Sequence, residues 1–336
     1  EISDKNLNSP HLAVMLIDLC LMRGINQHKL LKGTGLFYED ISKGEIKISP
    51  LQLFKLIENS QKLLNNHDMS FLLGRRFFPG NLGAISNVLL NAKNLSEMLK
   101  IIMRFQPLLF PLMFMQQKQY KHKTHLIINH ALGEFNDKHA IFMAELFCSI
   151  LVSVIKLRFG QNFPIVFKFP YSQPSHIEEY QVSLGENLQF DQHIFMIEIE
   201  NKYLNLQLQD SSKTLKSLYL SQCKKQRIKQ AGLIQHILIY LDKNTSATLE
   251  QSAAYLKISP ATFKRKLKQH NTSFQQLLDL VKKQTAIYQI TIEGSNNINV
   301  SHTLKFNDTT NFRRAFKRWT GITPNTLRHE KGVGVN

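Results

Sequence analysis

Two helix-turn-helix patterns follow each other in the last quarter of the chain, within residues 248–328. In each pattern a short apolar helix is followed by a turn and then by a second helix that starts at a capping residue. The second helix of such a unit is the one that enters a DNA major groove. Two units on one chain therefore predict a region that reads two successive groove faces.

The first pattern has well-marked helix boundaries. Thr248 is a suitable N-cap, and Ser259 followed by Pro260 predicts the start of the second helix, because proline loses no hydrogen bond at the first helical position. Phe263 and Leu267 stand four residues apart in that helix and predict its buried stripe. The opposite stripe, which a groove would meet, consists of Ala261, Lys264, Arg265 and Lys268.

The second pattern repeats this arrangement. Residues 300–304 predict the scaffold helix, and Asp308 predicts the cap of the second helix. Phe312, Phe316 and Trp319 follow the spacing of a buried helical stripe. The opposite stripe consists of Thr310, Arg313, Arg314 and Lys317.

The exposed positions of both helices fall into two groups, one suited to reading bases and one suited to contacting phosphates. Arginine can bond guanine O6 and N7 together, and short polar side chains in a first turn can reach base edges, whereas flanking cations and caps hold phosphates. Base reading is predicted for Ala261, Lys264, Arg265, Thr310, Asn311, Arg313 and Arg314. Phosphate contact is predicted for Ser259, Lys266, Lys268, Thr309, Lys317 and Arg318.

The distribution of charge indicates the same region. Residues 211–336 contain 21 lysines and arginines against 6 aspartates and glutamates, a net charge of +15, whereas residues 1–210 carry only +2 of the total of +17. A basic run alone is often just a solvated surface. Together with the tandem motif, it indicates phosphate binding.

At these residues the chain resembles the AraC/XylS transcription regulators. The resemblance is carried by residues 259–267, 272–278 and 311–324, and Arg328 closes the signature. It implies a seven-helix domain in which a long middle helix, about 274–290, holds the two recognition helices one duplex turn apart, about 34 Å. The partners that follow are double-stranded promoter DNA and RNA polymerase, and we expect an activator.

The sequence departs from this family at both helix-to-helix turns. Lys257 and Lys305 stand where the family has glycine, and Ser301 stands where it has alanine. A lysine held at a positive φ would cost about 1 kcal/mol or more, unless the turn takes another shape. The sequence leaves the geometry of these two turns open.

The first two hundred residues predict a mixed fold. Helical periodicity covers 11–31, 50–64, 95–104 and 137–159, and strand patterns cover 124–131, 165–169 and 195–199. We therefore predict an α+β N-terminal domain followed by an all-α C-terminal domain with two tandem helix-turn-helix units. The predicted boundaries are 1–209 for the first domain, 210–230 for a linker, 231–330 for the second domain and 331–336 for a tail.

Segments of the N-terminal part resemble the ligand-binding domain of one branch of the same family, the branch of the ornithine- and arginine-utilisation regulators. The resemblance lies in residues 80–90, 94–99 and 167–203 and is less specific, because its motif is mainly glycine and apolar positions. It implies effector sensing or formation of a homodimer. The expected effector is a carboxylate, an amino acid or an acyl compound.

Two groups of residues are candidate contacts for that effector. Arg104, Phe105, Phe110 and Met113 combine a cation with adaptable apolar side chains. Arg75 and Arg76 could hold an acidic group through their paired N–H donors. A packed core with Arg104 at its rim, and an exposed arginine pair, are the simpler interpretations of the same residues.

No metal site is predicted. Of His122, His125, His130 and His139, three lie in or beside a predicted strand, but they face unevenly and no cysteine or carboxylate cluster accompanies them.

Other features exclude further classes. The three cysteines are scattered, which suits a reducing cytoplasm. The apolar run 141–155 contains Glu145 and is shorter than the roughly 20 residues that span a bilayer, so we predict a buried helix and no membrane partner. Motifs for nucleotide binding or hydrolysis are missing, so we predict neither an enzyme nor a cofactor. The remaining alternative is an architectural or constitutive DNA binder whose N-terminal domain only dimerises.

Overall fold

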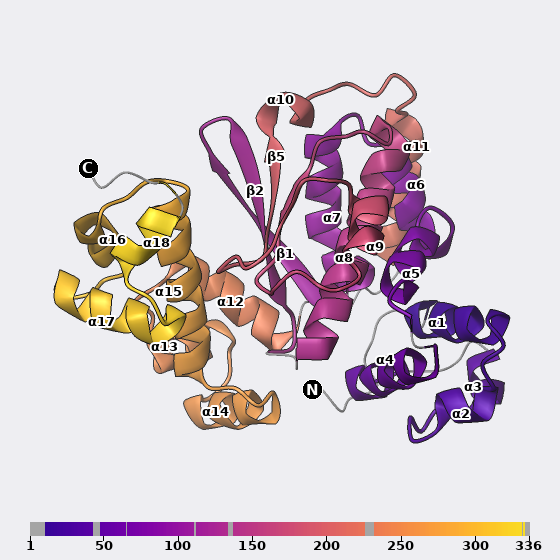
Figure 1. Ribbon diagram of the computed structural model, residues 1–336, viewed down its shortest axis with the longest axis horizontal. Coiled ribbons are helices and arrows are strands. Elements are labelled where there is room, and N and C mark those ends of the chain that lie inside the picture. The colour runs from indigo at the N-terminus through magenta and orange to yellow at the C-terminus, as the bar shows by residue number, and fades with distance from the viewer. Residues whose placement is uncertain are drawn as a thin grey trace.

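The computed structural model describes residues 11–42, 48–64, 66–110, 112–133, 137–225, 232–330 and 332. Its N-terminal half combines helices with a mixed sheet, and its C-terminal part is helical (Figure 1). The predicted fold class, α+β followed by an all-α part with two helix-turn-helix units, is confirmed.

The sheet contains five strands within the described residues, in the order β1-β2-β5-β3-β4. Most neighbours are antiparallel, and β3 and β4 are parallel. The strands are β1 (Met113–Tyr120), β2 (Lys123–His130), β3 (Val166–Lys168), β4 (Leu188–Gln189) and β5 (Met196–Glu200). The register pairs Leu126 with Gln117 on one side and with Ile197 on the other.

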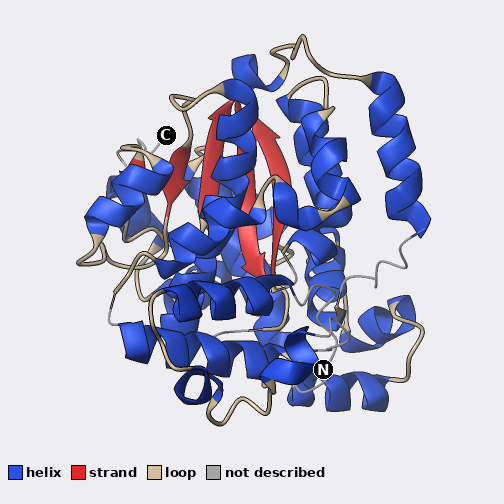
Figure 2. Cartoon of the chain, turned by 90° about the vertical axis from the view of Figure 1, so that its right-hand side faces the viewer, coloured by secondary structure: helices blue, strands red, loops and turns tan. Residues whose placement is uncertain are grey.

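Helices from the N-terminal half of the chain pack around this sheet (Figure 2). Before the first strand they are α1 (His11–Met22), α2 (Gln27–Leu31), α3 (Tyr38–Ser42), α4 (Pro50–Leu64), α5 (Met69–Phe77), α6 (Ala84–Leu90) and α7 (Leu95–Leu109). The later ones are α8 (Asp137–Phe159), α9 (Ile177–Leu184), α10 (Asn201–Leu204) and α11 (Lys213–Lys225). Helix α11, which falls in the predicted linker, packs against α6, and Lys216 Nζ lies 2.7 Å from Glu97 Oε1 on α7.

The C-terminal helices follow after residue 231. Within the described residues 232–330 they number seven, as the family resemblance implies. They are α12 (Leu233–Lys243), α13 (Leu249–Tyr255), α14 (Pro260–Gln269), α15 (Phe274–Thr291), α16 (Asn297–Thr303), α17 (Thr309–Thr320) and α18 (Pro324–Glu330).

The two faces of β2 belong to two different cores. Leu126 and Ile128 pack into the core of the N-terminal helices, whereas Ile127 packs with the C-terminal residues Ile287 and Ile290. Side chains alternate across a strand, so one strand can serve both cores. The sheet thus lies between the N-terminal helices and the C-terminal helices.

Helix α8 has the bounds that the sequence predicts. Its segment Lys138–Phe159 is long and apolar enough to cross a membrane by length and composition, but 72% of the 18-residue window is buried inside the protein. Burial of that extent is what a core helix shows, in agreement with the expected buried helix.

Other element predictions need correction. The predicted helix 11–31 is two helices, because the chain turns at Gly24, whose φ is +79°. The predicted helix 95–104 continues to Leu109, although Pro107 lies inside it. Strand β1 has no counterpart in the sequence prediction, because its outer half carries glutamines and a lysine that do not read as a buried strand.

Candidate functional site

The first helix-turn-helix unit consists of α13 and α14. Thr248 and Gln251 form a reciprocal capping box at the start of α13, and the Ser259 hydroxyl accepts a hydrogen bond of 3.2 Å from the backbone N–H of Thr262. Phe263 and Leu267 are buried, as predicted. These contacts fix α14 on its scaffold and leave the opposite stripe in solvent.

The exposed stripe of α14 is cationic. Ala261, Lys264, Arg265 and Lys268 are exposed, and Lys266 is half-buried. Among the described residues, none of these cations forms an ion pair. Unpaired cations on a convex helix are free to meet an anionic backbone.

The second unit, α16 and α17, repeats the geometry. The Asp308 carboxylate caps α17 by accepting a hydrogen bond of 2.6 Å from the backbone N–H of Asn311, and Gly321 ends the helix at φ +78°. Phe312 and Phe316 are fully buried, and Trp319 is half-buried. Thr310, Arg313, Arg314 and Lys317 are exposed on the other side.

Three of the predicted contact residues of α17 are not freely exposed, because two have a side-chain partner and one is half-buried. The Asn311 side-chain amide donates a hydrogen bond of 2.8 Å to Asp308. Arg318 lies 3.2 Å from Asp279 on α15. Thr309 is half-buried. Asn311 keeps its side-chain oxygen and a second N–H for a contact with DNA, and Arg318 keeps its other guanidinium N–H groups.

Both helix-to-helix turns take the shape that glycine usually provides. Lys257 and Lys305 each have a φ of +57°. In the first turn Lys257 N–H bonds to Ala254 and Ile258 N–H bonds to Ala253; the second turn repeats both bonds, with distances of 3.0 to 3.1 Å throughout. This pattern is the Schellman motif with lysine at its left-handed position.

Helix α15 joins the two units. Its Leu277 and Val281 pack into the core of the first unit, and its Ala286 and Ile290 pack into the core of the second. The buried Arg328 closes the second unit, because its guanidinium donates to the backbone oxygen of Ser295 at 2.7 Å. One rigid helix therefore sets the separation of α14 and α17.

The N-terminal sheet holds α12 and α15 through side-chain hydrogen bonds. They join Lys118 to Asp242 (2.9 Å), Asn129 to Gln284 (2.7 Å) and His125 to Tyr288 (3.0 Å). Behind His125, the carboxylate of Glu198 contacts Lys123 and lies 3.0 Å from Lys168 Nζ. The hydrogen bond with His125 and the two lysines hold the pKa of Glu198 well below its usual range.

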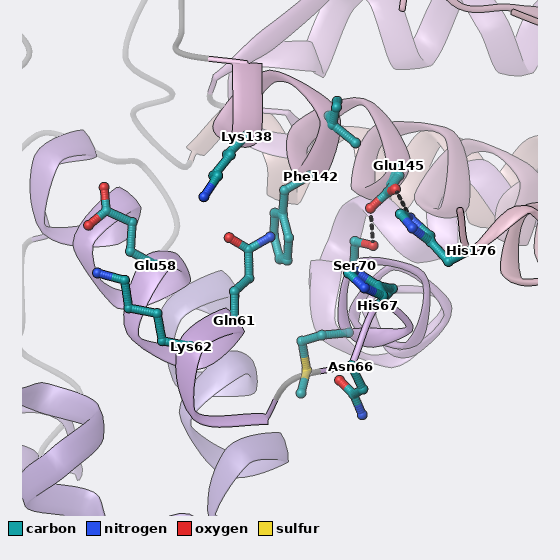
Figure 3. Close-up of a pocket in the computed structure, with 12 residues that line it drawn as sticks. Glu58, Gln61, Lys62, Asn66, His67, Ser70, Lys138, Phe142, Glu145 and His176 are labelled. Carbon is teal, nitrogen blue, oxygen red and sulfur yellow. Dashed lines mark hydrogen bonds and ion pairs between the residues drawn. The ribbon is translucent and has the colours of Figure 1, made fainter. Parts of the chain in front are cut away.

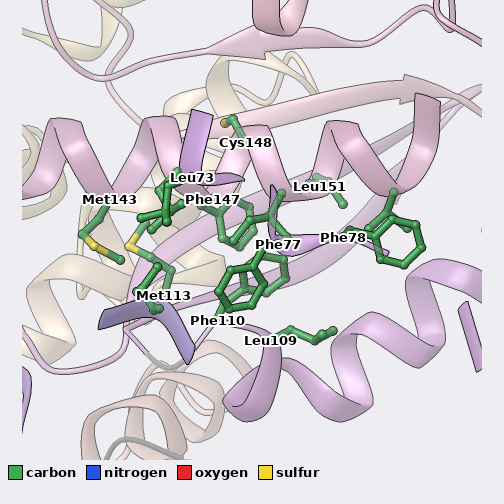
Figure 4. Close-up of a cluster of buried hydrophobic side chains, with 14 of the residues drawn as sticks. Leu73, Phe77, Phe78, Leu109, Phe110, Met113, Met143, Phe147, Cys148 and Leu151 are labelled. Atoms are coloured by element: carbon green, nitrogen blue, oxygen red, sulfur yellow. The ribbon is translucent and has the colours of Figure 1, made fainter. Parts of the chain in front are cut away.

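The six predicted effector contacts do not form one site. Arg75, Arg76 and Arg104 are exposed, and Arg75 donates a hydrogen bond of 2.9 Å to Ser183. The other three, Phe105, Phe110 and Met113, are buried. Phe110 and Met113 line a small apolar cavity of about 10 Å³ within a packed cluster (Figure 4).

A larger pocket lies elsewhere in the N-terminal half, between α4, α5, α8 and α9, with a volume of about 340 Å³. Glu145, Ser70 and His176 lie at one end, and Glu58, Lys62 and Lys138 lie at the other (Figure 3). The sequence interpretation missed these residues. One signal was available, namely a glutamate inside the apolar run 141–155.

The histidines are dispersed. His125 bonds to Tyr288, and His139 stacks on Phe54 with ring centroids 4.6 Å apart. Among the described residues, no group of three histidine, cysteine, aspartate or glutamate side chains could hold a metal ion.

Comparison with known proteins assigns both parts of the chain. Residues 24–208 match the N-terminal arabinose-binding domain of AraC transcription regulators, and residues 252–330 match a helix-turn-helix domain. The ornithine utilization regulator of Pseudomonas aeruginosa is 23% identical over 94% of this chain and 94% of its own length. The regulator VqsM of the same species is 24% identical over 76% of this chain and 82% of its own.

A third relative is similar in the C-terminal part. The regulator AdiY of Escherichia coli is 32% identical over 26% of this chain and 34% of its own length. These relatives are transcription regulators and not enzymes. Because the arabinose-binding-domain match alone covers more than half of the 336 residues, the chain belongs to the AraC family of DNA-binding transcription regulators.

Proposed function

We propose that this protein activates transcription in the cytoplasm by placing α14 and α17 in successive major-groove faces of promoter DNA. The observation that carries the proposal is the pair of exposed cationic stripes, each opposite a buried apolar stripe and both packed against α15. A spacing set by one rigid helix favours a binding site with two parts about one duplex turn apart.

The base-reading role is assigned to the exposed residues near the start and middle of each helix. Arg265 and Arg314 are the principal readers, because guanidinium groups bond guanine bidentately. Lys264, Arg313 and Thr310 flank them, and Ala261 offers an apolar contact. Asn311 joins this set through the side-chain oxygen and the N–H that Asp308 does not bind.

Phosphate contacts come from the flanks of both helices. The cations in this role are Lys266, Lys268, Lys317 and Arg318. The hydroxyl groups are those of Ser259 and Thr309.

We further propose that a small-molecule effector gates DNA binding. The contacts of the sheet with α12 and α15 would transmit a change in the N-terminal half directly to the helix that spaces the readers. A similar protein is an ornithine utilization regulator, which favours an amino-acid effector here. RNA polymerase is the proposed partner in activation, and a homodimer through the N-terminal domain, residues 1–209, is the proposed assembly.

The alternative is a constitutive or architectural regulator whose N-terminal domain only dimerises. The pocket of about 340 Å³ favours the gated function, since its volume falls in the range of small-molecule sites.

Selection of bound sites from a random duplex library, with and without a pool of cell metabolites, tests the proposal. A two-part motif whose recovery responds to the pool supports a gated regulator, and run-off transcription from the selected site gives the sign of regulation. A motif recovered equally in both conditions supports the alternative, and recovery of no motif contradicts both.

A further inference from the structure

We propose that the pocket between α4, α5, α8 and α9 binds a basic amino acid, with the distal cation of the ligand on Glu145 and its carboxylate on Lys62 and Lys138. This inference rests on the proposed effector gating and names the site and the ligand class. It follows from how charge is arranged inside the pocket.

Glu145 is a buried carboxylate that lacks a lysine or arginine partner among the described residues. Its side chain is 5% exposed, and it accepts hydrogen bonds from Ser70 (2.6 Å) and Tyr180 (2.8 Å). The Nε2 atom of His176 lies 2.7 Å from Oε1 of Glu145, the same oxygen that accepts the hydrogen bond from Tyr180. A carboxylate removed from water is costly unless a cation offsets its charge. A ligand ammonium or guanidinium group at this end of the pocket would supply that charge.

The opposite end of the pocket carries two lysines. Lys62 and Lys138 are exposed, and neither forms an ion pair with a described residue. Glu58 lies beside them and contacts Lys55 at 3.3 Å. This end suits the carboxylate and the α-ammonium of an amino acid, with the carboxylate on the lysines and the ammonium on Glu58 (Figure 3).

The length of the pocket selects a ligand with well-separated charges. Lys138 and Glu145 are seven residues apart on α8, which places them roughly 10 Å apart along the helix axis. An amino acid with a cation at the end of an extended side chain matches this distance. An amino acid with a short neutral side chain would leave the negative charge of Glu145 without a cation from the ligand.

Helix α8 also connects the proposed ligand site with the DNA-binding helices. Ile141 lines this pocket and a second cavity, of about 490 Å³, whose other walls include Ile234 of α12 and Leu280 of α15. The wall of the proposed ligand site is therefore also a wall of the space between the two halves of the protein. A ligand that fixes α8 would change the contact with α12 and α15.

The test is calorimetric titration of the full-length protein with L-lysine, L-ornithine and L-arginine. Two probes that each lack one charged group serve as comparisons: norleucine lacks the distal cation, and cadaverine lacks the carboxylate. At least one basic amino acid should bind, and norleucine and cadaverine should bind at least about tenfold more weakly, the loss expected for one charged hydrogen bond.

Variants locate the site. Glu145→Gln and the double variant Lys62→Met/Lys138→Met should each weaken binding about tenfold or more, whereas the exposed controls Glu178→Gln and Lys100→Met should bind as the wild type does. The double variant changes only exposed side chains, so it keeps the test decisive if Glu145→Gln fails to fold. Binding of none of the three basic amino acids, equal binding of norleucine, or unchanged binding by the double variant would overturn the proposal. Titration without DNA separates this result from the DNA-binding function, which the site selection tests independently.

Discussion

The Nδ1 atom of His125, on strand β2, lies 3.0 Å from the hydroxyl oxygen of Tyr288, on helix α15. His125 is 1% exposed and Tyr288 is 3% exposed, so this hydrogen bond is buried between the N-terminal sheet and the helix that spaces the two recognition helices. A buried polar atom that loses its partner costs about 1 to 3 kcal/mol. The contact is therefore a specific link between the two halves of the protein.

Removal of the Tyr288 hydroxyl should weaken the contact between β2 and α15. The variant Tyr288→Phe leaves His125 Nδ1 unpaired, so we expect a stability loss of about 1 to 3 kcal/mol and faster amide exchange in β2 and α15. Urea unfolding and hydrogen–deuterium exchange measure these effects. The exposed Tyr255→Phe is the matched control. Unchanged exchange in both elements would show that the bond does not hold the two halves together.

Loss of the principal readers should cost both affinity and selectivity. Arg265→Ala and Arg314→Ala should each weaken binding to the selected site by about 1 to 3 kcal/mol and relax the preference at one base pair. Fluorescence anisotropy with the selected site and its single-base variants measures this. If both variants discriminate among these duplexes as the wild type does, the base-reading assignment is wrong.

The flanking lysines should act without regard to sequence. Lys268→Ala and Lys317→Ala should weaken binding to specific and random duplexes alike and reduce the salt slope of log K by about 1 each. A salt titration of the binding constant checks this, with Lys100→Ala as a control far from the recognition helices. A loss confined to the specific duplex would instead indicate base contact.

Glycine should stabilise both turns. Lys257 and Lys305 have a φ of +57°, and glycine relieves the strain of this conformation, which is worth about 1 kcal/mol. Glycine also adds entropy to the unfolded chain, which opposes this gain. Lys257→Gly and Lys305→Gly should therefore each raise the free energy of unfolding, by less than about 1 kcal/mol. Lys264→Gly, in the interior of α14, should lower it by about 1 kcal/mol. Urea unfolding of the three variants decides this. Destabilisation by the turn substitutions would mean that the lysine side chains stabilise the turns by contacts of their own.

His130 should make stability depend on pH below neutrality. Burial lowers the pKa of His130 from 6.5 to about 4, and a hydrogen bond with the backbone of Gly133 opposes this only in part. Between these values the unfolded chain takes up a proton that the folded chain does not, so stability is highest above pH 6.5 and falls as the pH decreases towards 4. From pH 7 to pH 5 the loss from this group is about 2 kcal/mol. His130→Gln should remove it, and an equal pH dependence in the variant would contradict the assignment.

The sequence predicted the C-terminal part in detail because its signals are local. Caps at Ser259 and Asp308, the proline at position 260 and the aromatic stripe of Phe312 and Phe316 act within one or two helical turns, and all appear in the structure. The conformation of Lys257 was open, because the same turn can be made in more than one shape and the choice depends on hydrogen bonds to the preceding helix.

The N-terminal site could not be predicted in the same way. Glu145 becomes part of a pocket only because α5, α8 and α9 bring Ser70, His176 and Tyr180 to it from positions up to 75 residues away. The sequence cannot decide between core and ligand contact for Phe110 and Met113, because buried core residues and pocket residues share the same composition. Burial on both faces of β2 likewise depends on how the two halves pack.

The measurement that tests the central claim most directly is the affinity of the full-length protein for its selected site after base pairs are inserted between the two submotifs. If α15 holds α14 and α17 at a fixed separation, an insertion of about 5 base pairs, half a turn, and one of about 10, a full turn, should both reduce binding to that of a single submotif. Retention of full affinity after either insertion would contradict rigid reading by two helices.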